Sequence, residues 1–558
     1  MEKEIKRITD SDLAKLFIEK NEKENIISEL FNFFGVDCVA RCNIDPASLD
    51  RLVSEFENNG ENSAEVLAEI IKLMHEAKEY SRNKERELIE EIKGFICDNL
   101  TEDISIEEIA ARLNISYYYM CHFFKRNTGM SVNSFRNRKR IEKAIKLLYK
   151  TNDKISDIAT ACGFNNISYF TEVFTKLTGV APTGFKGKEN LVILEHYDLD
   201  AMLLANMVDS VRFLSDDIKT VSGENIEKVS VFEPDDKFNF LHEAAIIEFK
   251  GVLYASWYNC PVTELHGYTP ICGKRSYDGG KSWSDLEIIA RDETAKILYC
   301  PPVYGICDGK LYMLMNQMVG PDRMHAFDLY MLNEETDRFE FLWSKPLPFK
   351  LNTNVVKLPN GKLLLPGRIA KLDGFPNTPA VLISDNGKID TEWRLVKIAE
   401  NGDLPDGEKL VHPELSVILH EDTLYMFNRN DNRKVQLVYI SKDYGESWTR
   451  LLAHDIPYIS SKIYCGTLSN GKNYLIANDY VNGFDRSRLS AYFSGKDNMV
   501  FEKRIILTDY VNPDVGEPYA CHYPAACEYN GKLYVIATNS YRDAGRGAIL
   551  FIINIEDI

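Results

Sequence analysis

One short phrase recurs six times in the second half of this 558-residue chain. Each copy is a turn containing Gly or Asp followed by a short apolar strand, and successive copies lie about 50–60 residues apart. The copies read FKGVLYAS from 249, CDGKLYML from 307, PNGKLLLP from 359, HEDTLYMF from 420, SNGKNYLI from 469 and YNGKLYVI from 529. Repeats of this length, each made of a few strands, are typical of a β-propeller with one copy per blade. The sequence therefore predicts a six-bladed β-propeller over residues 226–558.

The ends of this region indicate how the propeller closes. IEKVSVFE at 226–233 precedes the first copy of the phrase, and the apolar segment GAILFIINI at 547–555 follows the last copy. We expect the early strand to pair into the last blade and so complete the ring.

A second motif fits the same frame. SYDGGKSW at 276–283 and SKDYGESW at 441–448 both follow Ser-x-Asp-x-Gly-x-x-Trp, and SDNGKIDTEW from 384 looks like a degenerate copy. In such a turn the Asp accepts hydrogen bonds from turn amides, the Gly allows a left-handed conformation, and the Trp packs into the blade. The motif therefore indicates a structural turn rather than a reaction centre.

The first third of the chain has helical periodicity instead. Residues 1–86 carry apolar residues at helical spacing, as in AEVLAEIIKLMHEA, and no chemical motif. We expect a helical region and connector there, with a packing or dimerisation role. Residues 87–188 then contain two short helix pairs joined by the basic amphipathic segment SFRNRKRIEKAIKLLYK, and residues 189–225 form a linker. The fold class is thus multidomain, α plus all-β.

Each helix pair in residues 87–188 has a turn and a start signal. In the first, the turn lies at Leu113–Ile115 and the second helix begins at Ser116, a good N-cap. In the second, Gly163 supplies the turn and the helix runs from about Asn166. Residues 88–188 contain 15 Lys and Arg against 11 Asp and Glu, although the whole chain has a net charge of −18. A basic island in an acidic chain is the electrostatic signature of a nucleic-acid module.

Residues 88–188 resemble the DNA-binding domain of the AraC family of bacterial transcription regulators. The matching residues span both halves: Ile109, Ala110, Ile115, Ser116, Tyr119, Phe124, Lys125, Gly129, Arg140, Ile141, Ala144, Leu147, Leu148, Ile158, Ala159, Gly163, Phe164, Tyr169, Phe170, Phe174, Gly179 and Pro182. The resemblance implies two recognition helices that enter successive major grooves of double-stranded DNA.

The resemblance also implies which side chains face the DNA. They are Tyr118, Cys121, His122 and Lys125 on the first recognition helix, and Asn165, Asn166, Ser168, Thr171 and Glu172 on the second. Asn166 either reads adenine or caps its helix. Glu172 departs from the family, in which a basic residue is common. Lys125 and the cluster of Arg136, Arg138, Lys139 and Arg140 are expected to contact phosphates, which gives affinity without sequence choice.

Residues 235–558 resemble the sialidase superfamily. HPELSVILHEDTLYMFNRN is similar to the blade with a catalytic Glu and a substrate Arg, which implies these roles for Glu414 and Arg429. NGFDRSRLSAYFS implies a second Arg at Arg486, and HYPAACEYNGKLYVI implies a nucleophilic tyrosine at Tyr523. Arginines bind a substrate carboxylate bidentately, and a nearby Glu takes the phenol proton.

Two parts of the sialidase pattern are absent. The strand FLHEAAIIEF has His242 and Glu243 where an Arg is expected, and the loop NCPVTELHGYTP has Glu264 and His266 but no acidic Asp. We therefore include His242, Glu264 and His266 among the candidate ligand-binding or catalytic residues.

Other features limit the classes of function. The N-terminal segment lacks an apolar signal core, no apolar run reaches 18 residues, and the twelve cysteines form no CxxC pair. We expect a cytoplasmic protein without membrane span, metal or cofactor, and a homodimer is one assembly it could form. The favoured hypothesis is a DNA-binding regulator whose propeller senses a saccharide. The alternatives are an intracellular exo-glycosidase of the sialidase type and a scaffold whose propeller binds another protein.

Overall fold

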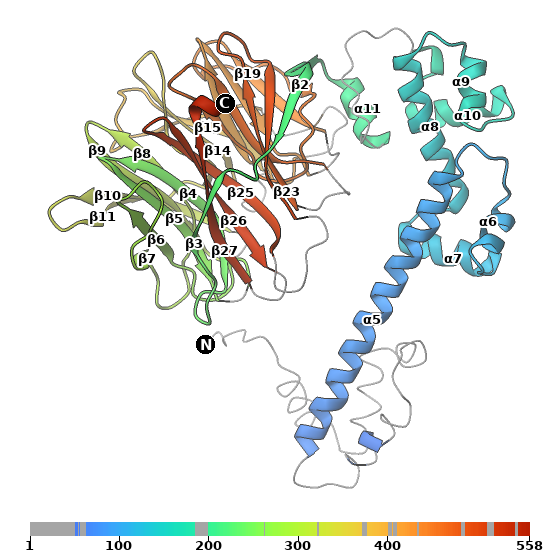
Figure 1. Ribbon diagram of the computed structural model, residues 1–558, viewed down its shortest axis with the longest axis horizontal. Helices are drawn as coiled ribbons and strands as arrows, with labels where there is room; N and C mark the ends of the chain where they lie inside the picture. The colour runs from blue at the N-terminus through green and yellow to red at the C-terminus, as the bar shows by residue number, and fades with distance from the viewer. Residues whose placement is uncertain are drawn as a thin grey trace. The chain divides into compact units, whose positions relative to one another are not determined.

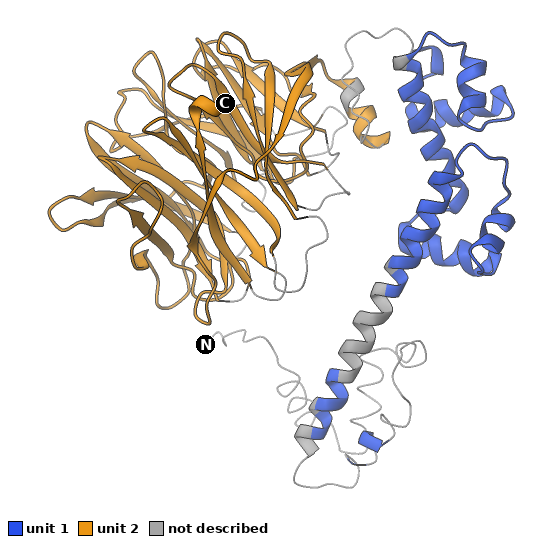
Figure 2. Ribbon diagram, in the orientation of Figure 1, with its two compact units in different colours: residues 1–187 blue, residues 188–558 orange. Residues whose placement is uncertain are grey.

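The computed structural model forms two compact units, residues 1–187 and 188–558 (Figure 2). It describes residues 51–53, 55, 63–184 and 199–558. Within the last range, 262, 321–322, 371–376, 400–403, 405–409, 432–434, 481–485, 511–517 and 542–544 are not described. The predicted fold class is confirmed, because the first unit is helical and the second is a propeller built of strands (Figure 1). None of the described helices is long and apolar enough to cross a membrane.

The described helices of the first unit follow the expected double helix-turn-helix order. They are α5 (Ser63–Asp98), α6 (Ile106–Arg112), α7 (Tyr117–Thr128), α8 (Val132–Lys150), α9 (Ile155–Ala161) and α10 (Ile167–Thr178), followed by the short η2 (Pro182–Gly184). The long helix α8 connects the pair α6–α7 to the pair α9–α10.

The two recognition helices are capped in the same way. The Ser116 hydroxyl accepts from the Tyr119 amide at 3.2 Å. The side-chain Oδ1 of Asn166 accepts from the Ser168 and Tyr169 amides at 2.8 and 3.0 Å. Each helix ends at a glycine, Gly129 or Gly179, with φ of +76°. Such caps satisfy backbone groups that a helix leaves unpaired at its ends. The sequence therefore fixes both ends of each recognition helix locally.

The described strands of the second unit form six blades, two of which belong to one 8-stranded sheet. Blade 1 consists of β4 (Phe240–Phe249), β5 (Val252–Cys260), β6 (Ile271–Ser276) and β7 (Glu287–Ala290). Blade 2 consists of β8 (Leu298–Cys307), β9 (Lys310–Met318), β10 (Met324–Asn333) and β11 (Arg338–Lys345). Blade 3 consists of β12 (Phe349–Leu351), β13 (Val356–Lys357), β14 (Leu363–Ile369), β15 (Thr378–Ser384) and β16 (Arg394–Lys397). Blade 4 consists of β17 (Leu415–His420), β18 (Thr423–Asn428), β19 (Leu437–Ser441) and β20 (Leu452–His454). Blade 5 consists of β21 (Tyr464–Thr467), β22 (Asn473–Asn478), β23 (Arg488–Ser494) and β24 (Phe501–Asp509). Blade 6 consists of β25 (Pro518–Tyr529), β26 (Lys532–Tyr541), β27 (Gly545–Asn554) and β3 (Glu227–Phe232).

The propeller closes as the sequence predicted. Strand β3 pairs antiparallel with β27 and supplies the outer strand of blade 6. Strand β27 also touches β4 of blade 1 through the pair Arg546 and Phe240, so that blades 6 and 1 share one sheet. The first and last strands of the propeller region therefore hold the ring together, as in other closed β structures.

The expected linker contributes to the propeller as well. Within residues 189–225, the structure describes helix α11 (Leu199–Met207) and strands β1 (Ser210–Val211) and β2 (Leu214–Ser222). Strand β1 pairs parallel with β20 of blade 4, and β2 pairs parallel with β24 of blade 5. This part of the linker expectation was wrong, because the unpaired outer edges of two blades offer hydrogen bonds to a passing segment.

The two Ser-x-Asp-x-Gly-x-x-Trp turns are built alike. The Asp278 carboxylate accepts from the Ser282 hydroxyl and the Ser282 and Lys281 amides, and these hydrogen bonds lower its pKa to about 2. Asp443 makes the same contacts with the amide and hydroxyl of Ser447. The motif thus works as a turn, as the sequence indicated.

Candidate functional site

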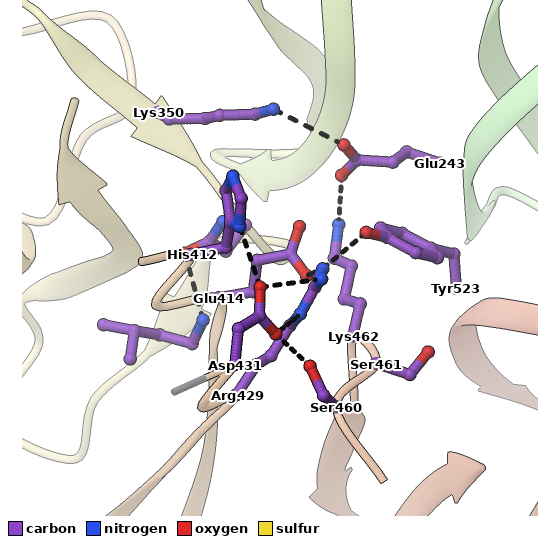
Figure 3. Close-up of polar contacts among 12 residues, drawn as sticks. Glu243, Lys350, His412, Glu414, Arg429, Asp431, Ser460, Ser461, Lys462 and Tyr523 are labelled. Atoms are coloured by element: carbon purple, nitrogen blue, oxygen red, sulfur yellow. Dashed lines mark hydrogen bonds and ion pairs between the residues drawn. The ribbon is translucent and has the colours of Figure 1, made fainter. Parts of the chain in front are cut away.

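Polar side chains from five blades gather where the inner strands of the propeller meet (Figure 3). Each comes from an inner strand or from the residues beside a strand end. Tyr523 lies on β25, Glu243 on β4 and Lys350 on β12. Glu414 immediately precedes β17, Arg429 follows β18, and Lys462 precedes β21.

Arg429 is the centre of the first group. Its Nη1 donates to Glu414 Oε2 and to the Tyr523 hydroxyl, both at 2.7 Å. Its Nε and Nη2 donate to the two oxygens of Asp431 at 2.7 and 3.0 Å, and Asp431 also accepts from His412 and Ser460. The structure therefore brings together three residues that the sequence singled out, and Asp431 orients the arginine.

Burial and charge set the protonation states of this group. Burial raises the pKa of Tyr523 to about 12, and the Glu414 carboxylate adds to that effect. Burial opposes ionisation of Glu414 too, but the Arg429 guanidinium beside it brings the pKa of Glu414 below its ordinary value. At neutral pH the tyrosine is thus a neutral phenol and Glu414 is a carboxylate. Arg429 lies between them as a shared donor.

Glu243 forms a second group that the sequence analysis did not select. Its carboxylate accepts from Lys462 Nζ at 2.7 Å and lies 3.7 Å from Lys350 Nζ (Figure 3). Burial opposes its ionisation, yet the charges of Lys462 and Lys350 lower the pKa of Glu243 to about 2. The charged residue is only 3% exposed, so the two lysines are what make its burial tolerable.

Glu243 and Tyr523 each lie in a β-bulge of an inner strand. The pairing of β4 with β5 shifts between His242 and Ala245, and that of β25 with β26 shifts between His522 and Ala525. Inside these bulges Glu243 has φ of +48° and Tyr523 has φ of +55°. A left-handed conformation is unfavourable for such residues and is concentrated at functional sites. The repeated His-x-x-Ala pattern is the sequence signal that could have found Glu243.

His242 lies beside the tyrosine. It is 2% exposed, and its ring centroid is 4.2 Å from that of Tyr523 and 5.5 Å from that of His522. Burial, together with nearby cations such as Arg546 and Arg486, brings the pKa of both histidines far below the ordinary value. Both rings are therefore neutral, and the buried Nδ1 atom of each has no hydrogen-bond partner.

The remaining sequence candidates lie at different distances from the tyrosine. The Arg486 guanidinium carbon is 5.2 Å from the Tyr523 ring centroid, so this arginine belongs to the site. Glu264 accepts from the Tyr258 hydroxyl at 3.1 Å and lies 4.0 Å from His242 Nε2. His266 is exposed and contacts the backbone oxygen of Glu264, so the structure does not bring its ring to the tyrosine. Among the described residues, no group of three or more His, Cys, Asp or Glu side chains could hold a metal ion.

On the first recognition helix, the predicted DNA-facing side chains lie on the surface. Tyr118 is 72% exposed, and its ring packs against His122 at 4.3 Å. Lys125 is exposed and Cys121 is half-buried. The opposite side of the helix is buried through Met120, Phe123 and Phe124. Helix α7 therefore presents an aromatic and basic surface.

On the second recognition helix, two candidates are used within the helix. The Asn166 side-chain oxygen accepts two backbone amides as the N-cap, which is the capping role expected for it. The Thr171 hydroxyl donates to the Ile167 carbonyl at 2.9 Å. Asn165, Ser168 and Glu172 are exposed. The surface of α10 is thus more polar and less basic than that of α7.

The basic cluster on α8 is partly internal. Arg136 donates to the Ile104 carbonyl at 2.6 Å, and the buried Arg140 donates to the carbonyls of Leu100 and Glu102 at 2.8 and 3.1 Å. Arg138 and Lys139 are half-buried. The guanidinium groups of Arg136 and Arg140 therefore join α8 to the segment before α6, which differs from the phosphate contacts expected for them.

These features define the class of protein: an AraC-type double helix-turn-helix domain joined to a propeller with repeated turns. The BNR repeat-like domain matches residues 251–535, half of the chain, and the protein belongs to this family. The helix-turn-helix domain model matches residues 109–188.

Curated relatives match the DNA-binding part. Regulatory protein PocR of Salmonella typhimurium is 32% identical over 96 residues, which are 17% of this chain and 32% of PocR. The bifunctional transcriptional activator/DNA repair enzyme AdaA of Bacillus subtilis is 34% identical over 100 residues, 18% of this chain and 47% of AdaA. The chain thus spans a third to a half of the length of these relatives.

Solved structures match the propeller. One is a protein of unknown function from Dyadobacter fermentans, with 14% identity and a TM-score of 0.48 over 60% of this chain and 100% of that chain. Another is the Trypanosoma rangeli sialidase in complex with the inhibitor DANA, with 14% identity and a TM-score of 0.46 over 59% of each chain.

Proposed function

We propose that this protein is a sequence-specific transcription regulator whose propeller senses an acidic saccharide. The observation that carries the proposal is the buried group of Arg429, Glu414 and Tyr523, beside Arg486, at the centre of the ring. A guanidinium held by Asp431 and aimed into a ring of inner strands suits a carboxylate on a sugar. The neutral phenol and the two neutral histidines suit the hydroxyl groups and the apolar face of the same ligand.

A sensor is favoured over an enzyme by what surrounds the tyrosine. Glu414 is paired with Arg429, which itself donates to the Tyr523 hydroxyl. An arginine that donates to the tyrosine hydroxyl fixes the position of the phenol but does not take its proton. A nucleophilic tyrosine needs a base that accepts the proton of its hydroxyl. The inner strand of blade 1 also places Glu243, an anion, where a third cation would assist a substrate carboxylate.

For DNA, the proposal rests on the AraC-type domain and on the surface of α7. The adjacent rings of Tyr118 and His122, tilted by 43° to each other, are expected to contact base edges, while Lys125 and Arg138 contact phosphates. On α10, the exposed Asn165 and Ser168 take the corresponding positions. The more polar α10 is expected to add less affinity than α7.

The test uses the full chain. Isothermal titration against N-acetylneuraminate, glucuronate and galacturonate, with glucose and galactose as neutral controls, should show binding of an acidic sugar only. Mass spectrometry of glycosides incubated with the protein should show no product. Fluorescence anisotropy with DNA from upstream of its own gene should show salt-sensitive binding that changes when the sugar is present. Absence of both sugar binding and DNA binding would refute the proposal.

The second candidate is an exo-glycosidase of the sialidase type, favoured by the placement of a buried tyrosine and a carboxylate, Tyr523 and Glu414, on the same Nη1 atom of Arg429. It predicts hydrolysis of a glycoside that Tyr523→Phe abolishes while binding persists. Glu414→Gln should then also reduce turnover, with binding of the product sugar retained. Turnover that survives both substitutions would exclude this mechanism.

A further inference from the structure

Three cations lie near the buried carboxylate of Glu243, and two of them, Lys462 and Lys350, contact it. Besides Lys462 and Lys350, a third cation, Arg368, stands on β14. Its backbone pairs directly with that of Lys350 on β12, so the two side chains lie on the same face of blade 3. Three cations thus face Glu243 from blades 3 and 5.

Arg368 itself lacks partners at two of its nitrogens. The residue is 5% exposed, and its Nε and Nη1 atoms are buried without a hydrogen bond. The charge of Arg368 contributes to the low pKa of both Glu243 and Glu414, which places the guanidinium near both groups. A buried guanidinium with unpaired donors is costly, and an anionic ligand would satisfy it.

The hydrogen bonds that join the carboxylates of the first group go to Arg429 and do not include Arg368. Arg429 already donates to Glu414, Tyr523 and Asp431, and Glu243 is taken by its two lysines. An acidic sugar bound beside Arg429 and Arg486 would therefore leave Arg368 unsatisfied.

We infer that the ligand of the propeller carries two acidic groups, and that Arg368 and Lys350 bind the second one. The inference rests on the proposed function, since it takes the first acidic group to lie beside Arg429 and Arg486. The second group is a phosphate, a sulfate or another carboxylate, because the same cations recognise all three. Lys462 keeps Glu243 in place beside it.

The experiment compares matched probes on the full chain. Calorimetry measures D-glucuronate against D-glucuronate 1-phosphate, and N-acetylneuraminate against its 9-phosphate. The doubly acidic probe of at least one pair should bind about tenfold more tightly, the value of one hydrogen bond to a charged group. The affinity of a phosphorylated probe should rise between about pH 5.5 and 7.5, because the second pKa of a phosphate is near 6. The affinity of a probe with a second carboxylate or a sulfate, such as 2-O-sulfated glucuronate, should not change over this range.

Variants locate the second group. Arg368→Gln should remove the tenfold gain and leave binding of the singly acidic sugar within about twofold. Arg368→Lys should restore part of the gain, and Arg338→Gln, an exposed arginine on β11, is the matched control. If the singly acidic sugar binds but its doubly acidic partner binds no better, or if the gain survives in Arg368→Gln, this inference is wrong and the proposed function stands. If neither kind of probe binds, both are wrong.

Discussion

Replacing Lys462 by Met removes the closest partner of the buried Glu243 carboxylate. Burial opposes ionisation of Glu243, but the charges of Lys462, Lys350 and Arg368 lower its pKa from the ordinary value of 4.5 to about 2. One pKa unit corresponds to about 1.4 kcal/mol, so the pairing with Lys462, Lys350 and their neighbours stabilises the folded propeller by about 3 kcal/mol at neutral pH. Breaking a buried pair by removing one partner costs about 3–5 kcal/mol. We therefore expect Lys462→Met to lower the free energy of unfolding of the propeller by about 3 kcal/mol at pH 7.

Tryptophan emission can follow the propeller by itself. All five tryptophans, Trp257, Trp283, Trp343, Trp393 and Trp448, lie in the propeller region. Urea unfolding of the full chain, monitored by this emission, gives the stability of the propeller from the midpoint and slope of its transition. Lys496→Met, at an exposed position beyond β23, serves as the control and should change the stability by less than about 0.5 kcal/mol.

The sign of the pH dependence follows from the same pair. Because folding lowers the pKa of Glu243, its contribution is complete above pH 4.5 and is lost as the pH falls towards 2. In Lys462→Met the carboxylate loses its closest cation, so the deficit relative to the wild type should be largest near pH 7 and shrink below about pH 5. The double variant Glu243→Gln, Lys462→Met should be more stable than Lys462→Met alone. A deficit below about 1 kcal/mol, or a double variant no better than the single one, would refute the reasoning.

Three further outcomes concern the DNA-binding unit. Gly163→Ala places a Cβ atom 2.9 Å from the Leu100 carbonyl oxygen at φ of +84°, so it should destabilise the second helix-turn-helix by more than about 1 kcal/mol, measured by thermal loss of ellipticity at 222 nm. Arg140→Ala removes the hydrogen bonds to the carbonyls of Leu100 and Glu102 and should cost about 2–3 kcal/mol in the same assay, with little change in the tryptophan transition of the propeller. Lys125→Gln should weaken DNA binding uniformly across sequences and reduce the slope of log affinity against log salt by about one, measured by anisotropy.

Most of the fold was predictable because local sequence patterns mark its turns and strands. Five of the six turn-and-strand phrases form the hairpin between the first two described strands of a blade, and PNGKLLLP joins β13 to β14 in blade 3. The early strand closes blade 6 as β3. Strands β1 and β2 were missed because they bear no such pattern. Residues 214–222 alternate little between buried and exposed, and their partner β24 lies far along the chain. Pairing of an edge strand depends on which edge is open, and that is decided by the tertiary structure.

The candidate site was only half predictable for a related reason. Glu414, Arg429 and Tyr523 belong to motifs that could be matched residue by residue. Lys350 and Lys462 are single charged residues in apolar surroundings, and only the ring of blades brings them to Glu243. Glu243 and Tyr523 share the pattern His-x-x-Ala, but the pattern alone does not show that it forms a bulge with a left-handed residue. The sequence shows which residues are charged along one strand, but it does not show which charged residues of five different blades come into contact.

Control of DNA binding by a sugar requires two conformations of the chain that the sugar binds unequally. After the DNA-binding unit, the chain adds β1, β2 and β3 to the outer edges of blades 4, 5 and 6 before it enters β4, which carries Glu243. The covalent connection from the helices to β4 therefore runs along the outer edges of three blades. Coupling of this kind is reciprocal. A sugar that changes the affinity for DNA tenfold must itself bind tenfold differently to the DNA-bound protein. Measuring sugar affinity on the free and the DNA-bound chain thus decides whether the two units communicate, whatever the route between them.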